Sequence, residues 1–495
     1  MGKMMKRQLL SKSKYLNGLQ CLKYLWLLFN DKDKIPQPDD STQHVFDEGH
    51  RIGELAKCLF PDGIDIPSDD FIGNLNKTRE ALQSKHPLFE PGFYIDGYFS
   101  RLDILDPVED GIWDIYEVKG STSVKDVNIH DISFQRHCAQ LAGLEIRRCF
   151  VIHLNNLYVK NGEIEPRQLF TIVDVTEQVD EVAAGIVDRA EEMWEVIASP
   201  TCPEIGIGPY CSDPYDCPVT WCRECLPKNN IFNLYRGGKK CFDMFNQGIF
   251  FVKDIPPSMK LSAVQQIQQT CEITQNPFID KKAIREFLNS LQYPLHYLDF
   301  ETFSPAIPIY DGTRPYQKVP FQFSLHFVGN QGAKPEHYGF LGDGTDDPRP
   351  GFLAELQNHI GNDGNILVYN QSFEKGVLKE LGGAFPDYTL WVEEICNRVV
   401  DLYGPFRNFS YYHPLQEGSA SIKKVLPALT GKGYDGLNIG KGDDASLAFF
   451  NMVMGNFTYT ENLKVRQDLE EYCSLDTEGM VCILEKLGEL VSDPP

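Results

Sequence analysis

Hydrophobic and polar residues alternate along several short segments, and this pattern predicts strands. Before residue 230 the segments read FYIDGYFSRLDIL, GIWDIYEVKG and RRCFVIHLN, and after residue 292 they read HYLDFETF, FQFSLHFVG and NILVYN. Alternation with a period of two places every second side chain on the same face of a strand. The polar residues of one face can therefore meet at one site while the opposite face joins a core.

Between these strands the apolar residues follow helical spacing. A long helix is predicted over residues 176–198. Residues 231–292 are mostly helical in pattern, with a break at DIPPSMK, where adjacent prolines interrupt a helix. Strands that alternate with helices indicate the α/β class with mixed sheets. We therefore predict an N-terminal domain of residues 1–230, a helical connector of residues 231–292 and a C-terminal domain of residues 293–495.

Length and charge narrow the class of protein. A chain of 495 residues is too long for one ordinary core and favours two or three domains. The net charge of −23 argues against a protein that binds nucleic acid through bulk positive charge, but it allows an enzyme with a local basic groove. The apolar runs are too short to span a bilayer, and the basic N-terminus lacks the apolar core of a signal peptide. We therefore expect a cytoplasmic protein with no membrane partner.

Two acids and a lysine form the first candidate site. Asp103 lies on one strand pattern, and in IYEVK on the next strand Glu117 and Lys119 share a face. An aspartate and a glutamate together suit a hard cation such as Mg²⁺ or Mn²⁺. A lysine beside them can stabilise a developing phosphoryl charge or orient an attacking water. A hairpin with one solvated charged face is the alternative that this spacing leaves open.

A second pair of acids lies in YLDFET, within a run that otherwise has the pattern of a buried strand. Asp299 and Glu301 are two residues apart, so both side chains point to the same face. Both could then contact one pair of metal ions. An edge strand with solvated acids is the alternative.

The first site resembles a known nuclease core. Asp103 followed by Glu117-Val118-Lys119 is similar to the PD-(D/E)XK motif in its RecB-like branch. FDEGHRIGELA resembles the first motif of that branch, and DISFQRHCAQLAGLEI resembles its glutamine-bearing helix, although alanine stands where a tyrosine is usual after the glutamine. The resemblance implies a restriction-endonuclease-like fold. It implies metal ligation by His50, Asp103 and Glu117, catalytic roles for Lys119 and Gln135, and a further acid at Glu90.

The same resemblance predicts a role for the cysteines as metal-cluster ligands. Of the 14 cysteines, several fall in one short segment with the spacing Cys211-x5-Cys217-x4-Cys222-x2-Cys225. Cys21 opens CLKYLWLL, like the lone N-terminal cysteine of RecB-like iron–sulfur nucleases, including the CRISPR-associated ones. The resemblance implies a [4Fe–4S] cluster on Cys21, Cys211, Cys217 and Cys222, with Cys225 as the substitute for the last. A zinc knuckle made from the cysteines between 202 and 225 is the alternative.

The C-terminal acids resemble the first motif of the DEDD, or DnaQ-like, 3′–5′ exonucleases. ILVYNQSFEKGVLKEL is similar to the second motif, with Glu374 where aspartate is usual, and EEYCSLDTEGM supplies the third. The resemblance implies an RNase H-like fold and a metal site formed by Asp299, Glu301, Glu374 and Asp476. Tyr472 would position or activate the attacking water. Such acids repel one another unless divalent ions neutralise them.

Other residues near these motifs have weaker patterns. Arg314, Tyr316 and Gln322 could line a substrate groove by stacking and hydrogen bonding, with core packing as the alternative. Lys423, with Ser421 and Lys424, could contact a phosphate backbone, with a solvated helix start as the alternative. We interpret Asp401 as a structural residue.

The chain as a whole resembles an uncharacterised bacterial family that joins these two nuclease modules. The resemblance implies a metal-dependent nuclease that uses Mg²⁺ or Mn²⁺ and acts on single-stranded DNA or DNA ends, with RNA as the alternative substrate. In one alternative a single module is active and the other is a nucleic-acid clamp. In others the protein is a non-catalytic zinc-binding adaptor or a phosphodiesterase for small oligonucleotides. The sequence identifies no protein partner.

Overall fold

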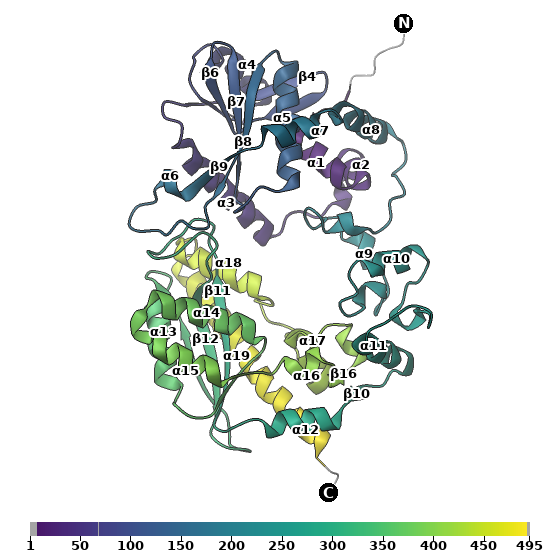
Figure 1. Ribbon diagram of the computed structural model, residues 1–495, viewed down its shortest axis with the longest axis vertical. Coiled ribbons are helices and arrows are strands. Elements are labelled where there is room, and N and C mark those ends of the chain that lie inside the picture. Colours follow the sequence, from purple (N-terminus) through teal and green to yellow (C-terminus); the bar gives the residue numbers. More distant parts are fainter. Residues whose placement is uncertain (1–6, 68, 493–495) are drawn as a thin grey trace. The chain divides into compact units, whose positions relative to one another are not determined.

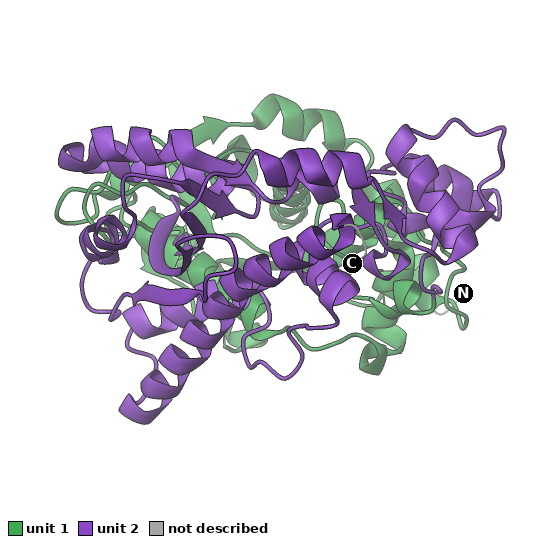
Figure 2. Ribbon diagram, turned by 90° about the horizontal axis from the view of Figure 1, so that it is seen from below, with its two compact units in different colours: residues 1–225, 306–316 green, residues 226–305, 317–495 purple. Residues whose placement is uncertain are grey.

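The computed structural model (Figure 1) describes residues 7–67 and 69–492. The chain divides into two compact units, coloured separately in Figure 2. Unit 1 comprises residues 1–225 with residues 306–316, and unit 2 comprises residues 226–305 with residues 317–495. Both units combine helices with sheets, so the α/β class is confirmed. The predicted connector of residues 231–292 stays a prediction.

Unit 1 is built on a sheet of six strands in the order β2-β3-β6-β7-β8-β9. Strands β6 and β7 form an antiparallel hairpin, and α5 then crosses over so that β8 lies parallel to β7. A smaller sheet has the order β1-β5-β4. The strands are β1 (Leu10–Ser11), β2 (Ile64–Asp65), β3 (Leu88–Phe89), β4 (Gly92–Ile95), β5 (Tyr98–Arg101), β6 (Ile104–Glu109), β7 (Ile112–Lys119), β8 (Glu145–Leu154) and β9 (Phe170–Asp174).

The helices of unit 1 pack around one main core. Helix α5 contributes Ile132, Phe134 and Cys138 to it, and β7 contributes Trp113 and Ile115. The helices are α1 (Lys12–Gln20), α2 (Leu22–Asn30), α3 (Asp40–Lys57), α4 (Phe71–Ala81), α5 (Asp126–Leu141), α6 (Pro166–Leu169), α7 (Thr176–Ala183), α8 (Ile186–Ala198) and α9 (Trp221–Glu224).

Residues 306–316 form part of unit 1 although they follow β11 of unit 2 in the chain. The backbone N–H of Ala306 donates to Glu48 Oε1 on α3 at 2.9 Å. The hydroxyl of Tyr316 donates to the carbonyl of Gly120, directly after β7. The segment is therefore fixed by specific hydrogen bonds inside unit 1.

Unit 2 is built on a sheet of five strands in the order β13-β12-β11-β14-β15. Strand β11 pairs antiparallel with β12 and parallel with β14, so the sheet is mixed. Strands β10 and β16 form a separate two-stranded sheet. The strands are β10 (Phe278–Ile279), β11 (Leu295–Phe303), β12 (Val319–Val328), β13 (Glu336–Leu341), β14 (Asn365–Val368), β15 (Val399–Asp401) and β16 (Tyr411–Tyr412).

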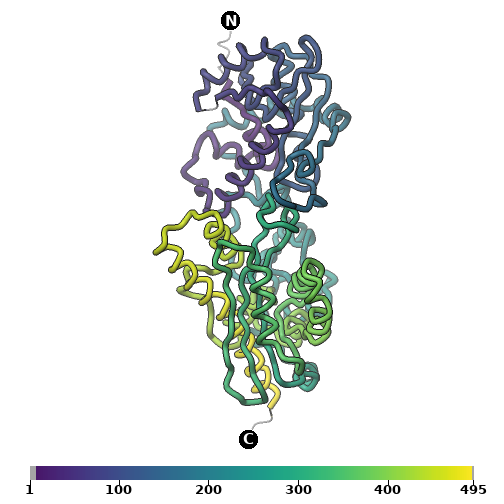
Figure 3. Tube along the Cα trace, turned by 90° about the vertical axis from the view of Figure 1, so that its left-hand side faces the viewer, coloured from purple at the N-terminus to yellow at the C-terminus, as the bar shows by residue number. Residues whose placement is uncertain are grey.

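The two faces of β11 differ in chemistry. Leu298 and Phe300 join an apolar core with side chains of α13, α14 and α15. Asp299 and Glu301 alternate with them and lie on the opposite face, where α19 runs along the sheet (Figure 3). The helices of unit 2 are α10 (Lys240–Asn246), α11 (Ala263–Thr274), α12 (Lys281–Asn289), α13 (Pro348–His359), α14 (Gln371–Ala384), α15 (Thr389–Arg398), α16 (Gly404–Arg407), α17 (Ile422–Thr430), α18 (Gly442–Val453) and α19 (Tyr459–Val491). Of the described helices, none combines the length and the apolar character that crossing a membrane requires.

The packing of α18 against β11 gives a stability prediction. Phe449 of α18 is fully buried, stacks on Phe321 at a centroid distance of 4.0 Å and meets the edge of Phe303 at 5.1 Å. Phe449→Ala should lower the free energy of unfolding of unit 2 by about 3–5 kcal/mol, because it leaves a cavity between helix and sheet. Urea denaturation followed by circular dichroism measures this loss.

The matched control is Leu463→Ala on α19, whose side chain is 52% exposed. It should change the free energy of unfolding by no more than about 0.5 kcal/mol. An equal effect of both substitutions would contradict the packing described.

Candidate functional site

Three carboxylates meet on the α19 face of the unit 2 sheet. Among the described residues, Asp299, Glu301 and Asp476 are the one set of three or more possible metal-binding side chains whose ligand atoms all lie within 4.8 Å of one another. Two come from β11, and the third comes from α19. Carboxylate oxygens so close together suit a hard divalent cation.

Polar contacts with β12 fix α19 over these acids. The hydroxyl of Thr477 lies 2.6 Å from Ser324 Oγ and 2.8 Å from His326 Nδ1. The amide of Gln322 donates to the carbonyl of Leu469 at 2.9 Å. Gln322, which the sequence placed in a substrate groove, is buried and holds the helix.

Two tyrosines and a lysine surround Asp476. Tyr472 lies one turn before Asp476 on α19, and the hydroxyl of Tyr434 donates to Asp476 Oδ1 at 2.5 Å. The Lys423 ammonium lies 5.1 Å from the ring centre of Tyr472 and 5.7 Å from that of Tyr434. It donates to the carbonyl of Gly440 at 2.7 Å, so it stands beside the acids without pairing with them. The neighbouring Lys424 pairs instead with Glu417.

Glu374 lies in the first turn of α14 and is only 1% exposed. Its Oε2 is buried without a hydrogen-bond partner among the described residues. Its charge contributes to the raised pKa of Asp299, but it lies outside the group of three. The carboxylate of Asp401 accepts hydrogen bonds from the backbone of Asn370 and Tyr403, as a structural residue does.

Burial raises the pKa of every acid in this centre, and repulsion from neighbouring acids adds to the shifts of Asp299 and Glu301. Burial, followed by the charges of Asp476, Glu301 and Glu374, raises the pKa of Asp299 well above its ordinary value. Burial raises the pKa of Glu301 to about 8, with Asp476 as the next cause. Burial also raises the pKa of Glu374 to about 8 and that of Asp476 to about 6. The centre resists full ionisation unless positive charge enters it.

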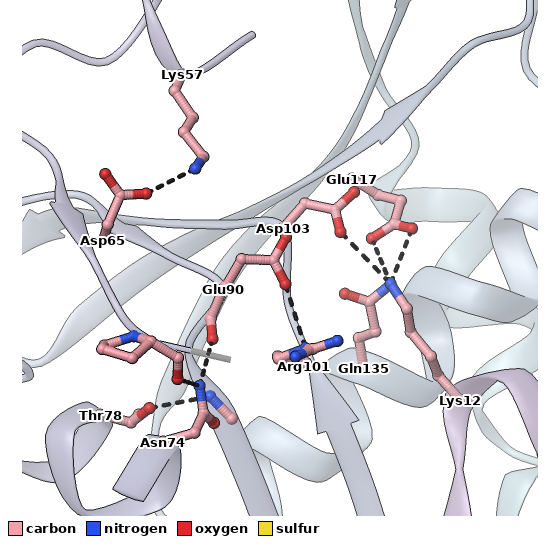
Figure 4. Close-up of polar contacts among 12 residues, drawn as sticks. Lys12, Lys57, Asp65, Asn74, Thr78, Glu90, Arg101, Asp103, Glu117 and Gln135 are labelled. Carbon is pink, nitrogen blue, oxygen red and sulfur yellow. Dashed lines mark hydrogen bonds and ion pairs between the residues drawn. The ribbon is translucent and has the colours of Figure 1, made fainter. Parts of the chain in front are cut away.

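In unit 1, a second group of acids surrounds the end of β7 (Figure 4). Glu117 and Lys119 come from β7, and Gln135 comes from α5. Lys119 Nζ lies 2.7 Å from Glu117 Oε1, and the amide of Gln135 donates to Glu117 Oε2 at 2.6 Å. Asp103 Oδ2 accepts from the backbone N–H of Val118 at 2.8 Å. The structure therefore brings together four residues that the sequence proposed as one site.

Two residues of this group were missed by sequence reasoning. Lys12, the first residue of α1, lies 3.1 Å from Glu117 Oε1 and 3.5 Å from Asp103 Oδ1. Asp131 lies one turn before Gln135 on α5, accepts from Gln135 Nε2 at 2.9 Å and pairs with Lys119 at 2.6 Å. The one-turn spacing of Asp131 and Gln135 was a usable signal, whereas no pattern in the sequence connects Lys12 to the other residues.

The charges around Glu117 shift its pKa and those of its neighbours. Burial raises the pKa of Glu117 to about 8, with Asp103 and Asp131 as further causes. Burial opposes the charge of Lys119, yet Asp131 and Glu117 hold its pKa well above the ordinary value. Burial likewise opposes the charge of Asp131, but Lys119 and Lys12 keep its pKa below the usual range.

A cleft of about 750 Å³ opens over this group, lined among others by His50, Glu90, Asp103, Glu117 and Lys119. His50 projects from α3 and lies in the cleft wall, outside any close three-ligand group among the described residues. Glu90 pairs with the Arg101 guanidinium at 3.2 Å. The cleft gives the acids of unit 1 access to a ligand.

The four cysteines proposed as ligands share a cavity of about 470 Å³ in unit 1. Cys21, Cys211, Cys217 and Cys222 all line it. Cys225, the proposed substitute, and Cys202 are not among the lining residues. The side-chain amide of Gln20 donates to the carbonyls of Tyr210 at 2.9 Å and Tyr215 at 2.6 Å, which ties the end of α1 to the cysteine loop.

Arg314, the remaining residue proposed for substrate binding, belongs to unit 1. Arg314 is exposed in the segment of residues 306–316, which belongs to unit 1 rather than to the unit of Asp299 and Glu301.

The raised pKa values predict how stability depends on pH. Without metal, the folded protein keeps protons on Glu301 and Glu374 that the unfolded chain has already released. Stability should therefore fall as pH rises from the ordinary carboxyl value of 4.5 to about 8. Mn²⁺ binds the ionised acids and should raise the Tm more at the upper end of this interval than at the lower end. Melting curves with Mn²⁺ and with a chelator measure both effects.

Glu301→Gln/Glu374→Gln removes two of these protonation sites and should flatten the pH dependence in the chelator. A Tm in chelator that is constant or rises over this interval would contradict the prediction.

Comparison with known proteins adds a family match. Residues 296–421 match the family model described as "Domain of unknown function (DUF2779)". This range contains Asp299, Glu301 and Glu374 and ends before Asp476.

Three curated relatives are similar to part of the chain. An uncharacterised protein of Mycoplasma genitalium is 27% identical over 222 residues, which cover 41% of this chain and 33% of the relative. An uncharacterised protein of Mycoplasma pneumoniae is 26% identical over 206 residues, which cover 38% of this chain and 31% of the relative. An uncharacterised protein of Ureaplasma parvum is 26% identical over 223 residues, which cover 40% of this chain and 31% of the relative. The chain thus spans about a third of the length of the curated relatives it matches. These matches show that residues 296–421 are similar to a domain of unknown function and that part of the chain is similar to uncharacterised proteins.

Proposed function

We propose that the protein is a metal-dependent nuclease whose unit 2 removes nucleotides from the 3′ end of DNA. The observation that carries the proposal is the set of Asp299, Glu301 and Asp476, with ligand atoms within 4.8 Å of one another. Two divalent ions held there would clamp the attacking and leaving oxygens of a phosphodiester. The buried, unpartnered Oε2 of Glu374 supports a fourth ligand at the same centre.

The sheet of unit 2 supports this proposal at the level of fold. An antiparallel β13-β12-β11 set followed by parallel β14 and β15 is the arrangement expected of an RNase H-like domain. In this arrangement β11 presents its acids to α19, which carries Tyr472 and Asp476. Tyr472 is 3% exposed and lies one turn before Asp476, so in this proposal its hydroxyl would orient the attacking water.

We propose a second nuclease centre in unit 1. The β6–β7 hairpin, the α5 crossover and parallel β8 fit the PD-(D/E)XK core. Asp103 and Glu117 are the residues that would hold Mg²⁺ or Mn²⁺, which would activate water and offset phosphate charge. Lys119 carries a positive charge beside them, and Gln135 fixes the Glu117 carboxylate.

We also propose a [4Fe–4S] cluster on Cys21, Cys211, Cys217 and Cys222. Four sulfurs held about 2.3 Å from one zinc ion lie within about 4 Å of one another. Among the described residues, no three cysteine sulfurs all lie within 4.8 Å. Wider spacing around a shared cavity fits a cluster whose four irons each take one thiolate. The cluster would join α1 to the cysteine loop and stabilise unit 1.

DNA is the proposed substrate because the RecB-like iron–sulfur enzymes that unit 1 resembles act on DNA ends. The test is a cleavage assay with Mn²⁺ on single-stranded DNA and RNA labelled at either end. Asp299→Asn/Glu301→Gln should slow 3′ trimming about 1,000-fold or more, and Tyr472→Phe about 100-fold, because the first removes metal ligands and the second a hydroxyl. Lys119→Ala tests unit 1: any cleavage that this substitution abolishes is assigned to the unit 1 centre.

Glu478→Gln is the control, because it lies on α19 close to Asp476 but is half exposed and pairs with Lys432. It should leave trimming unchanged. A folded wild-type protein that cleaves neither DNA nor RNA with Mn²⁺ or Mg²⁺ would overturn the proposal in favour of a non-catalytic adaptor.

The cluster has its own test. The purified protein should be brown, absorb at about 400 nm and contain four irons per chain. Cys211→Ser and Cys217→Ser should each abolish the absorbance and lower the Tm of unit 1. Cys225→Ser and Cys202→Ser serve as controls because neither lines the cavity, and both should keep the colour. A colourless protein that holds one zinc ion would contradict this assignment.

A further inference from the structure

Unit 1 places two lysine ammonium groups, not one, against its central carboxylate. Lys12 Nζ lies 3.1 and 3.3 Å from the two oxygens of Glu117 and 3.5 Å from Asp103 Oδ1 (Figure 4). Lys119 Nζ approaches Glu117 from β7. The motif resemblance accounts for Lys119 alone, so the role of Lys12 requires a separate explanation.

Lys12 is held in place by its surroundings. It directly follows β1, which pairs with β5 at the edge of the site, and the Ser11 side chain caps its helix. Tyr15 on the same helix is fully buried, stacks on Phe134 of α5 at 4.6 Å and accepts a hydrogen bond from Arg189 at 2.8 Å. The stem of Lys12 therefore starts from a fixed backbone, unlike that of a mobile surface lysine.

Helix α1 also packs closely against α8. A methyl group placed on Gly18 would lie 2.7 Å from the Met193 side chain, so α1 and α8 are in close contact. The C-terminal end of α1 is tied by Gln20 to the cysteine loop, and Cys21 follows at the cavity. The ammonium of Lys12 is thus presented to the acids by a helix anchored at both ends.

The charges of this group nearly balance. With all three carboxyls ionised, Asp103, Glu117 and Asp131 face Lys12 and Lys119, which leaves a single net negative charge. One divalent ion reverses that charge to a single positive one, and a second would add two more positive charges in a buried site.

The centre of unit 2 is different. No lysine or arginine nitrogen of the described residues lies within 4.0 Å of Asp299, Glu301, Glu374 or Asp476, whereas two do so around Glu117. The acids of unit 2 therefore have no ammonium group in direct contact, although Lys423 stands near Glu301 and Asp476.

Building on the proposed function, we propose that Lys12 is a built-in cation that replaces a second divalent ion, so that the unit 1 centre binds one ion. Lys12 acts through Asp103 and Glu117 and is a positioning residue. Its fixed positive charge offsets the negative charge of these carboxylates, as a second divalent ion would otherwise do. Unit 2, which lacks such a lysine, binds two ions.

The test counts Mn²⁺ in the full-length protein with the unit 2 centre silenced by Asp299→Asn/Glu301→Gln/Asp476→Asn. Calorimetric titration gives the number of ions, and electron paramagnetic resonance distinguishes an isolated Mn²⁺ from a coupled pair. With Lys12 present we expect one isolated ion. Adding Lys12→Met should raise the count to two and produce a coupled signal, while Lys12→Arg should retain one ion.

Lys14→Met is the matched control. Lys14 lies on the same helix, but its ammonium faces the Phe29 ring at 4.1 Å and the carbonyl of Leu9 at 3.4 Å, away from the acids. It should leave the count at one. Circular dichroism of each variant verifies that unit 1 is folded.

The outcomes separate the two proposals. Two ions with Lys12 present, or one ion both with and without it, would overturn the role of Lys12 while leaving a metal centre in unit 1. Binding of ions only after Lys12→Met would also overturn the role of Lys12, because the lysine would then block the metal centre. No Mn²⁺ in any variant would overturn the metal centre of unit 1 itself. Two ions with Lys12 present would overturn the role of Lys12 even if Lys12→Met fails to fold.

Discussion

The burial of like-charged carboxyl groups is the constraint on which the rest of unit 2 depends. Asp299, Glu301 and Asp476 repel one another where water cannot screen them, and this repulsion works to separate β11 from α19. The contacts of Thr477 and Gln322 with the sheet and helix resist that separation. On the other face of β11, Leu298 and Phe300 anchor the strand in an apolar core. The scaffold thus holds the acids in a geometry that costs stability when no cation is bound, as expected for a site shaped by function.

The two units differ in how they offset the negative charge of their clustered carboxylates. In unit 1 the central carboxylate is already neutralised by ammonium groups from two elements, α1 and β7. In unit 2 Lys423 stands near the acids but contacts tyrosine rings and a backbone carbonyl instead of an acid. Ammonium groups in direct contact offset carboxylate charge, so the two centres differ in how their negative charge is compensated. The difference lies in side chains outside the sequence motifs of the two sites.

The sequence predicted those parts of the structure that depend on local pattern. Strand alternation placed Asp299 with Glu301 and Glu117 with Lys119 on common faces, because side-chain direction in a strand follows from position alone. Helical spacing likewise placed Tyr472 one turn from Asp476. Lys12, Tyr434 and the segment of residues 306–316 could not be found in this way. Each joins its site through a contact more than 40 residues away along the chain, which no local periodicity encodes.

Helix α1 connects the two candidate centres of unit 1. Its first residue, Lys12, reaches the carboxylates at β7, and Cys21 follows its last residue at the cysteine cavity. A helix of nine residues is about 14 Å long and stiff over that length, so a displacement at one end moves the other. Gln20 and Tyr15 fix the helix between those ends. One rigid element therefore joins the Lys12 ammonium to the cysteine cavity.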